Sequence, residues 1–230
     1  MKDQMLELAR EDGFIDSIFK YCDKWCERCS FTSKCRHFAL SENESATNGP
    51  ELWEYLEAVF KATMLMLDEM TAKMGIDLPP EPDLLEHTLS KKVCELSFDM
   101  HDWLKHNKPG ELILKGVDII HSVETKNSRF KESIEVIYWY NFFISEKIVR
   151  ALRKVDKNVE NEIQNDSNGS AKIALIALDR LIASWSVLME NMMNHEDEIL
   201  KILVSLADVR KETETTFPLA GKFVRPGFDQ

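Results

Sequence analysis

Apolar residues recur along most of this chain at intervals of three and four residues, which is the spacing of one face of an α-helix. The pattern predicts five such helices, over residues 14–29, 51–74, 83–106, 171–194 and 196–211. Pro50 lies at a favourable helix start, and the three prolines of segment 75–83 must separate two helices. No stretch of the sequence alternates apolar and polar residues as a strand would.

The segment 117–168 contains neither glycine nor proline, so it is also predicted to be helical, with a bend near 126–128. Apolar residues surround the helix almost completely over 136–144, which predicts that this part is buried. Segment 166–170 is typical of a turn with an N-cap, and the very apolar helix after it is predicted to be central. The predicted buried face consists of Phe130, Ile134, Ile137, Asn141, Ile144, Ile148, Ala151 and Val155.

These elements predict an all-α fold, an antiparallel helical bundle with a short N-terminal cysteine-bearing helical appendage and an extended C-terminal tail. Residues 1–48 would form the cysteine-cluster segment and residues 49–230 the bundle with its packed tail. The polar segment 41–50 would link the two. Three phenylalanines in the tail indicate that it packs on the bundle: Phe217, Phe223 and Phe228.

The charge of the chain narrows the possible partners. Its formal net charge is −11, with 29 basic and 40 acidic residues, so it lacks the broad basic surface of a nucleic-acid or anionic-membrane binder. A charged N-terminus and the absence of any long apolar stretch favour a cytoplasmic protein. A protein partner and the oligomeric state stay open. One basic set is interpreted as a solvated helix face: Lys147, Arg150, Arg153, Lys154 and Lys157.

Four of the five cysteines lie within 14 residues, in the pattern C-x3-C-x2-C-x5-C formed by Cys22, Cys26, Cys29 and Cys35. If 14–29 is one helix, the first three share a face and the fourth returns from the following loop. In a reducing compartment such a cluster favours metal or redox chemistry over disulfides. Cys94, alone on a predicted helix, is interpreted as a core residue.

The spacing of the cysteines leaves the metal open. A compact run of four is more typical of an iron–sulfur cluster, whereas zinc usually takes two separated C-x2-C pairs. The alternative without metal is a set of small buried hydrophobic residues with a reactive thiol. The first three cysteines also match the triplet of radical S-adenosylmethionine enzymes. That interpretation is rejected for two reasons. Those enzymes resemble β/α barrels, whereas this chain shows no alternation of strands and helices. They usually have an aromatic residue before the third cysteine, whereas this chain has Arg28 there.

Two weaker polar sets lie on predicted helices. Asp118, His121 and Glu124 are spaced along one helix edge, as metal ligands or an acid–base set would be, although a solvated edge is favoured. Asp179 and Arg180 interrupt an apolar run, so each needs a partner on another helix or a ligand. A structural ion-pair network is favoured over a pocket, with four candidate partners: Glu124, Arg129, Glu146 and Arg150.

Four stretches of the chain read YCDKWCERCSFTSKC, EVIYWYNFFISEKIVRAL, NGSAKIALIALDR and FVRPGFD. Together they resemble a group of uncharacterised bacterial all-helical proteins with an N-terminal four-cysteine cluster. The resemblance covers most of the chain. It implies no activity and no catalytic residue, because none is assigned to that group.

Three functional hypotheses follow from the sequence. The first is a protein that binds zinc or an iron–sulfur cluster through the four cysteines, for redox sensing, electron transfer or fold stabilisation. The second is a metal-dependent or small-molecule enzyme with a polar site inside the bundle, around His121, Glu124, Asp179 and Arg180. The third is a helical interaction module with structural zinc.

Overall fold

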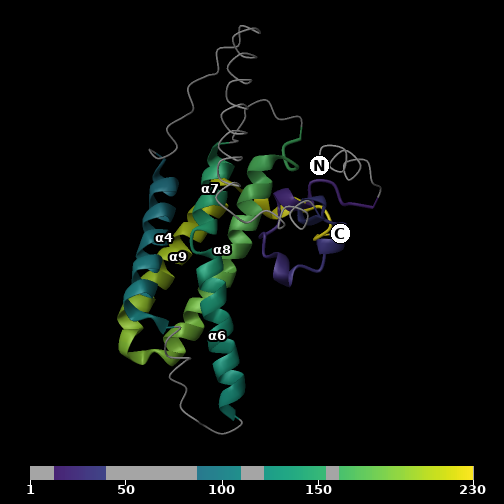
Figure 1. Cartoon of the computed structure of the whole chain (residues 1–230). Coiled ribbons are helices and arrows are strands. Elements are labelled where there is room, and N and C mark those ends of the chain that lie inside the picture. The colour runs from purple at the N-terminus through teal and green to yellow at the C-terminus, as the bar shows by residue number, and fades with distance from the viewer. Residues whose placement is uncertain (1–12, 40–86, 110–121, 154–160, 230) are drawn as a thin grey trace, which may run out of the picture. The chain divides into compact units, whose positions relative to one another are not determined.

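The computed structural model of the chain describes residues 13–39, 87–109, 122–153 and 161–229, with no side-chain description at 122–127 (Figure 1). The described residues divide into two compact units. One, the cysteine unit, spans Met1–Lys20 and Cys26–Pro82, and its described residues are 13–20 and 26–39. The other comprises Tyr21–Trp25 together with the helices and the C-terminal tail. The expected domain boundary at residue 48 lies outside the described residues.

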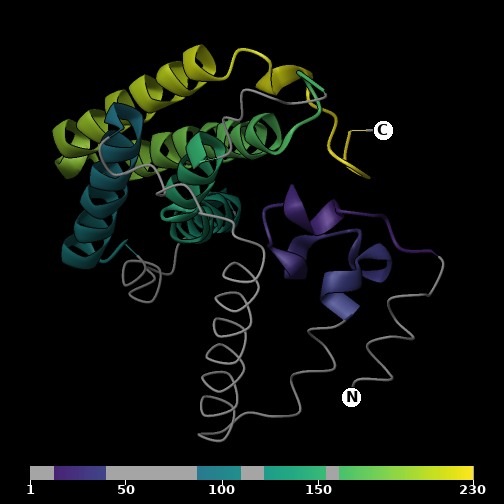
Figure 2. The ribbon, with the colours of Figure 1, turned by 90° about the horizontal axis from the view of Figure 1, so that it is seen from above.

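The second unit is an all-α bundle, as the sequence predicts (Figure 1, Figure 2). Helix α8 is its centre because it packs against α6, α7 and α9, while α4 covers α7 and α9. No strand occurs in the described ranges. The predicted helix over 51–74 lies outside them. The helices of the bundle are α4 (Thr88–Asn107), α6 (Ser122–Tyr140), α7 (Phe143–Arg153), α8 (Asp166–Asn191) and α9 (Glu196–Thr216).

The core of the bundle contains the predicted apolar face of α6 and α7. Each of its described members is at most 8% exposed, whereas Val155 lies outside the described residues. Helix α8 contributes a run of buried residues that includes Leu178, Leu181 and Trp185. The Trp185 ring meets the edge of Trp103 from α4, with ring centroids 5.0 Å apart. Helical periodicity therefore predicted the buried face of α6 and α7 correctly.

The helix over 122–153 is interrupted at residues 141–142, not at 126–128 as expected. Asn141 is buried there, and its backbone carbonyl accepts a hydrogen bond of 2.8 Å from the hydroxyl of Ser97 on α4. A side chain that bonds a helix carbonyl is a common cause of a break in a helix. The cause of the interruption therefore lies on a neighbouring helix.

The start of α8 also differs from the expectation. Residues 166–170 belong to the helix, and Asn165 is its N-cap. The side-chain oxygen of Asn165 accepts a hydrogen bond of 2.9 Å from the backbone amide of Asn168. The hydroxyl of Ser167 donates to the carbonyl of Ala151 at 2.6 Å, which ties α8 to the end of α7. Asp166 thus lies in the first turn, where a carboxylate interacts favourably with the helix dipole.

The predicted helix over 14–29 is wrong. The segment instead contains the single-turn 3-10 helices η1 (Ile18–Lys20) and η2 (Cys26–Arg28), and η3 (Thr32–Lys34) follows. Ser17 and Lys24 adopt left-handed backbone conformations, with φ of 61° and 57°. An α-helix cannot pass through such residues, so the cysteines do not share one helix face.

The C-terminal tail packs on the bundle through Phe217 and Phe223, which are buried, as expected, whereas Phe228 is half-buried. Lys172 of α8 holds the tail by donating to the Phe223 carbonyl and by an ion pair of 2.8 Å with Asp229. Arg225 forms a second ion pair with Asp229, also at 2.8 Å.

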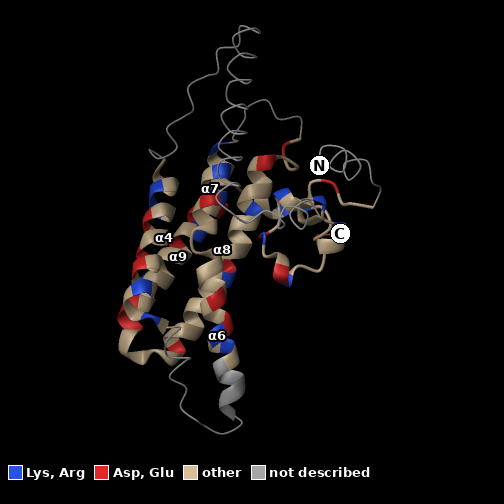
Figure 3. Cartoon of the chain, viewed as in Figure 1, with Lys and Arg blue, Asp and Glu red and all other residues tan. Residues whose placement is uncertain are grey.

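Charged residues of the bundle are interspersed along its helices, as α4 and α6 show in Figure 3. Lys147, which the sequence placed on a solvated face, has a fully buried side chain, so that interpretation is wrong at this position. Among the described helices, none combines the length and the apolar character needed to span a membrane.

Replacing Asp229 by Asn should make the stability of the chain less sensitive to acid. Burial raises the pKa of this carboxyl, but hydrogen bonds from Arg225 and Lys172 outweigh it and hold the pKa well below its usual range. The ion pairs therefore stabilise the fold fully above about pH 4, and the stabilisation is lost as the pH falls below that value. Urea unfolding at pH 7 should show Asp229→Asn less stable by about 1–2 kcal/mol.

The difference between Asp229→Asn and the wild type should shrink as unfolding is measured from pH 4 down to pH 2. Glu214→Gln is the matched control, because Glu214 forms an exposed pair with Arg210 on α9 and should cost less than about 0.5 kcal/mol. A constant difference across this pH range would contradict the assignment.

Candidate functional site

The first cysteine lies in a short segment, Tyr21–Trp25, that is docked on the bundle and is called here the anchor segment. At its centre, the Asp23 carboxylate accepts a hydrogen bond of 2.6 Å from the Tyr140 hydroxyl. The same carboxylate forms an ion pair of 2.7 Å with Arg180. Arg180 also donates to the Tyr140 hydroxyl. The Asp23 backbone carbonyl accepts a hydrogen bond of 2.9 Å from the indole N–H of Trp139. One residue thus binds both α6 and α8.

The electrostatics of this contact favour an ionised Asp23 and a neutral tyrosine. Burial raises the pKa of Asp23, but the hydrogen bonds from Tyr140, the Trp25 amide and Arg180 prevail and lower it. Burial and the Asp23 carboxylate together raise the pKa of Tyr140. The phenol therefore acts as a donor to a charged acceptor, which is the stronger kind of hydrogen bond.

An aromatic contact supports the same docking. The Trp25 ring stacks on Trp139 of α6, with centroids 5.0 Å apart and planes 15° apart. It also meets Tyr140 edge-on at 6.0 Å. Such pairs add about 0.5–1.5 kcal/mol to the burial of their surface.

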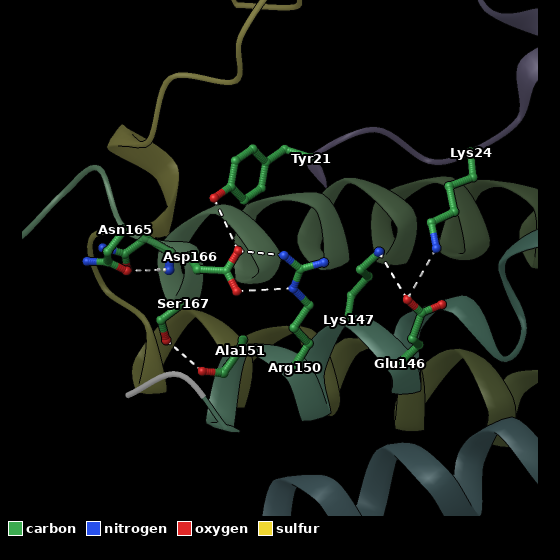
Figure 4. A network of polar contacts seen from close by, with 10 residues as sticks. Tyr21, Lys24, Glu146, Lys147, Arg150, Ala151, Asn165, Asp166 and Ser167 are labelled. Carbon is green, nitrogen blue, oxygen red and sulfur yellow. Dashed lines mark hydrogen bonds and ion pairs between the residues drawn. The ribbon is translucent and has the colours of Figure 1, made fainter. Parts of the chain in front are cut away.

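At the other end of the anchor segment, Tyr21 binds the start of α8. Its hydroxyl donates a hydrogen bond of 3.1 Å to the Asp166 carboxylate. Arg150 of α7 donates two further hydrogen bonds to this carboxylate, of 2.6 and 3.1 Å (Figure 4). Burial, with the neighbouring Asp166 charge, raises the pKa of Tyr21 to about 12. The Tyr21 ring lies against Phe223 of the tail and directly over Gly169.

A third contact involves the buried Lys147. One Glu146 oxygen accepts from Lys147 at 3.2 Å and pairs with Lys24 of the anchor segment at 3.7 Å (Figure 4). Burial lowers the pKa of Lys147, against the opposing effect of Glu146. The Lys147 ammonium also lies 5.0 Å from the centroid of the Phe143 ring, where a cation–π interaction compensates part of its desolvation.

The other three clustered cysteines lie in the cysteine unit. Cys26 begins η2, Cys29 follows it, and Cys35 is the C-cap of η3. The Phe31 amide donates to the Cys29 sulfur at 3.4 Å. The Ile15 amide donates to the Lys34 carbonyl at 3.0 Å, which closes the loop that contains the cysteines. All five cysteines of the chain are described and half-buried, and none forms a disulfide.

The described cysteines are not assembled into a ligand group. Within the described ranges, no three side chains of histidine, cysteine, aspartate or glutamate lie close enough together to hold one metal ion. A metal at Cys22, Cys26, Cys29 and Cys35 would therefore have to gather its ligands as it binds.

The structure places Asp179 and Arg180 on the outside of α8, with side chains 57% and 49% exposed. Each has a partner on another element, but not among the four expected residues. Asp179 pairs with Arg210 of α9 at 2.6 Å, and Arg180 pairs with Asp23. They do not line an interior pocket.

The other predicted polar set is outside the description. Asp118 and His121 lie outside the described residues. Glu124 lies within α6, but its side chain is not described. The hypothesis of a site around His121 and Glu124 stays a prediction.

Sequence reasoning missed the residues that dock the anchor segment, namely Tyr21, Asp23, Tyr140 and Asp166. A signal was present in the stretch YCDKWC, where aromatic and acidic residues separate two cysteines. Aromatic and charged residues next to clustered cysteines often pack against a neighbouring part of the protein. The partners Tyr140 and Asp166 carried no comparable signal.

Comparison of the chain with protein families, curated proteins and solved structures finds no match. The resemblance to bacterial all-helical proteins therefore stays a prediction.

Replacing Gly169 by Ala should destabilise the bundle, although alanine is the better helix former by about 1 kcal/mol. A Cβ at this position would lie 2.4 Å from the Tyr21 ring and 2.8 Å from Phe223. Both rings are held in place, so we expect a net loss of about 1–3 kcal/mol in urea unfolding.

The matched control is Gly221→Ala, because a Cβ there has no atom within 4 Å. It should change stability by less than about 0.5 kcal/mol. If Gly169→Ala is instead the more stable variant, Tyr21 does not dock over α8 as described.

Proposed function

We propose that this chain binds a zinc ion or an iron–sulfur cluster through thiolates, and that the metal orders the cysteine unit. The ligands are Cys26, Cys29 and Cys35 of that unit, with Cys22 as the fourth from the sequence spacing. The observation that carries the proposal is the concentration of four thiols within 14 residues, none of them in a disulfide. Thiolates are the preferred ligands of both centres.

The described segments of the cysteine unit bury few residues, which supports a role for metal in ordering them. Ile18 is its one buried residue within 13–20 and 26–39. The regular structure of these described segments is short, consisting of three 3-10 turns and helical residues at 36–39. These described segments therefore contribute little hydrophobic stabilisation of their own. In domains of this kind the free energy of metal binding becomes free energy of folding.

A hydrogen bond to the Cys29 sulfur also supports the proposal. The Phe31 N–H donates to the Cys29 sulfur from two residues further along the chain. Amide hydrogen bonds to sulfur stabilise thiolates and tune the metal that they hold. The Cys29 sulfur thus already accepts an amide hydrogen bond of the kind that metal-bound thiolates accept.

The cellular setting of the proposal is the cytoplasm, where thiols stay reduced and available to metals. Among the roles considered, ordering of the cysteine unit is the one that its limited packing favours. Electron transfer would require the iron–sulfur form, because zinc has no redox chemistry of its own.

Protein purified without oxygen should contain either about one zinc, or iron and sulfide with a broad absorption band near ~400 nm. Elemental analysis and an absorption spectrum separate the two. Cys26→Ala should lose most of the metal, because a centre with three remaining thiolates is weaker. Cys94→Ala is the control and should keep it, because Cys94 lies on α4 and outside the motif.

Circular dichroism should show that both variants keep the helices of the bundle. Wild-type protein without metal, even after reconstitution with Zn²⁺ under reducing conditions, would overturn the proposal. Equal metal content in Cys26→Ala and Cys94→Ala would also overturn it.

A further inference from the structure

Helix α9 has a second apolar face besides the one that it buries in the bundle. It packs on α8 and α4 and lies along one edge of the bundle (Figure 2). Its buried face includes Ile199, Ile202, Leu206 and Val209. A helix at the edge of a bundle normally has a polar outer face. The outer face of α9 instead contains a row of apolar residues, called here the outer stripe: Leu200, Leu203, Val204 and Ala207.

The outer stripe is open to solvent. Leu200 and Val204 are 49% and 54% exposed, and Ala207 is also exposed. Leu203 lies at the margin of the stripe and is partly buried against the core. A single exposed apolar residue is ordinary on a protein surface. A row at intervals of three and four residues is the pattern of a helix that contacts a second helix along its length.

The charges at the two ends of the outer stripe show which helix would fit it. Glu196 lies four residues before Leu200, Lys211 lies four residues after Ala207, and both are exposed. In an antiparallel pair of α9 helices that cross between positions 203 and 204, Leu200 faces Ala207 of the second copy. Glu196 then faces Lys211, and two-fold symmetry repeats each contact. A parallel pair would instead bring like charges together at both ends.

The flank of the outer stripe has the same complementarity. Lys201 and Asp208 are exposed and lie on one side of the stripe, seven residues apart. In the antiparallel pair this flank faces the same flank of the second copy. Lys201 of one helix then comes within one helical turn of Asp208 of the other. The bulky Leu200 opposite the small Ala207 also allows close packing at the centre.

From this pattern we infer that the outer stripe is a self-association surface, on which α9 pairs antiparallel with α9 of a second copy of the chain. Burial of the exposed apolar residues drives the association, and the terminal charges set its direction. One helix pair is a small interface, so the dimer is weak, with a Kd in the micromolar range. The inference is independent of the proposed metal, because α9 contains no cysteine.

The experiment is sedimentation equilibrium of the full chain across about 1–300 µM, in reducing buffer that prevents disulfides between copies. The wild type should show a monomer–dimer equilibrium. Val204→Glu should raise the Kd at least about tenfold, because each copy would bring a charge into the apolar contact. Ser205→Glu is the matched control. It adds the same charge at the next exposed position, away from the stripe, and should stay within about twofold of the wild type.

A charge exchange tests the antiparallel direction. Lys211→Glu alone should weaken the dimer, because it places a carboxylate opposite Glu196. Glu196→Lys alone should weaken it as well, since two lysines then face each other. The double variant Glu196→Lys, Lys211→Glu should recover most of the wild-type affinity, because opposite charges face each other again. Both residues are exposed, and circular dichroism checks that every variant keeps its helices.

Three results would overturn the inference. A wild type that stays monomeric over the whole concentration range would leave the stripe to another occupant, such as a different protein. A dimer that Val204→Glu and Ser205→Glu affect equally would use a different surface. Failure of the double variant to recover affinity would contradict the antiparallel pairing.

Discussion

The docking of the anchor segment depends on the compensation of one charge. Asp23 brings a carboxylate against α6 and α8, where it exchanges water for the Tyr140 hydroxyl and the Arg180 guanidinium. Tyr140 and Arg180 are 40 residues apart in the sequence, and they meet because α6 packs on α8. The binding position for Asp23 therefore exists only when the bundle is folded.

The other residues of the anchor segment pack on the bundle on either side of Asp23. Trp25 stacks on the neighbour of Tyr140, and Tyr21 reaches the start of α8, where Asp166 is held by Arg150. The small Gly169 leaves room for the Tyr21 ring. Cys22 lies between these contacts, whereas Cys26, Cys29 and Cys35 belong to the other unit, whose described residues include one buried side chain, Ile18. A folded bundle and a metal would thus stabilise different parts of the same N-terminal region.

The sequence predicted what periodicity determines and missed what tertiary contacts determine. The face from Phe130 to Ala151 is buried as predicted, because a helical repeat of apolar residues has one way to avoid water. The interruption at Asn141 was misplaced, because its carbonyl is bonded by Ser97 of another helix. The 14–29 helix was wrong, because Ser17 and Lys24 take left-handed conformations that no spacing rule detects.

The same limit applies to the candidate site. Sequence reasoning found that Asp179 and Arg180 need partners, since charges within an apolar run must be compensated. It could not identify Arg210 and Asp23, because that requires the rotation of α8 about its axis and the path of the N-terminal chain. The cysteine motif was evident from spacing, but the residues that dock the anchor segment were not.

The most direct test of a thiolate metal site is X-ray absorption at the metal edge, on the full chain purified without oxygen. The account predicts a first coordination shell of four sulfur atoms at about 2.3 Å, whether the metal is zinc or iron. A shell of nitrogen and oxygen atoms would contradict it, because the metal would then lie away from Cys22, Cys26, Cys29 and Cys35.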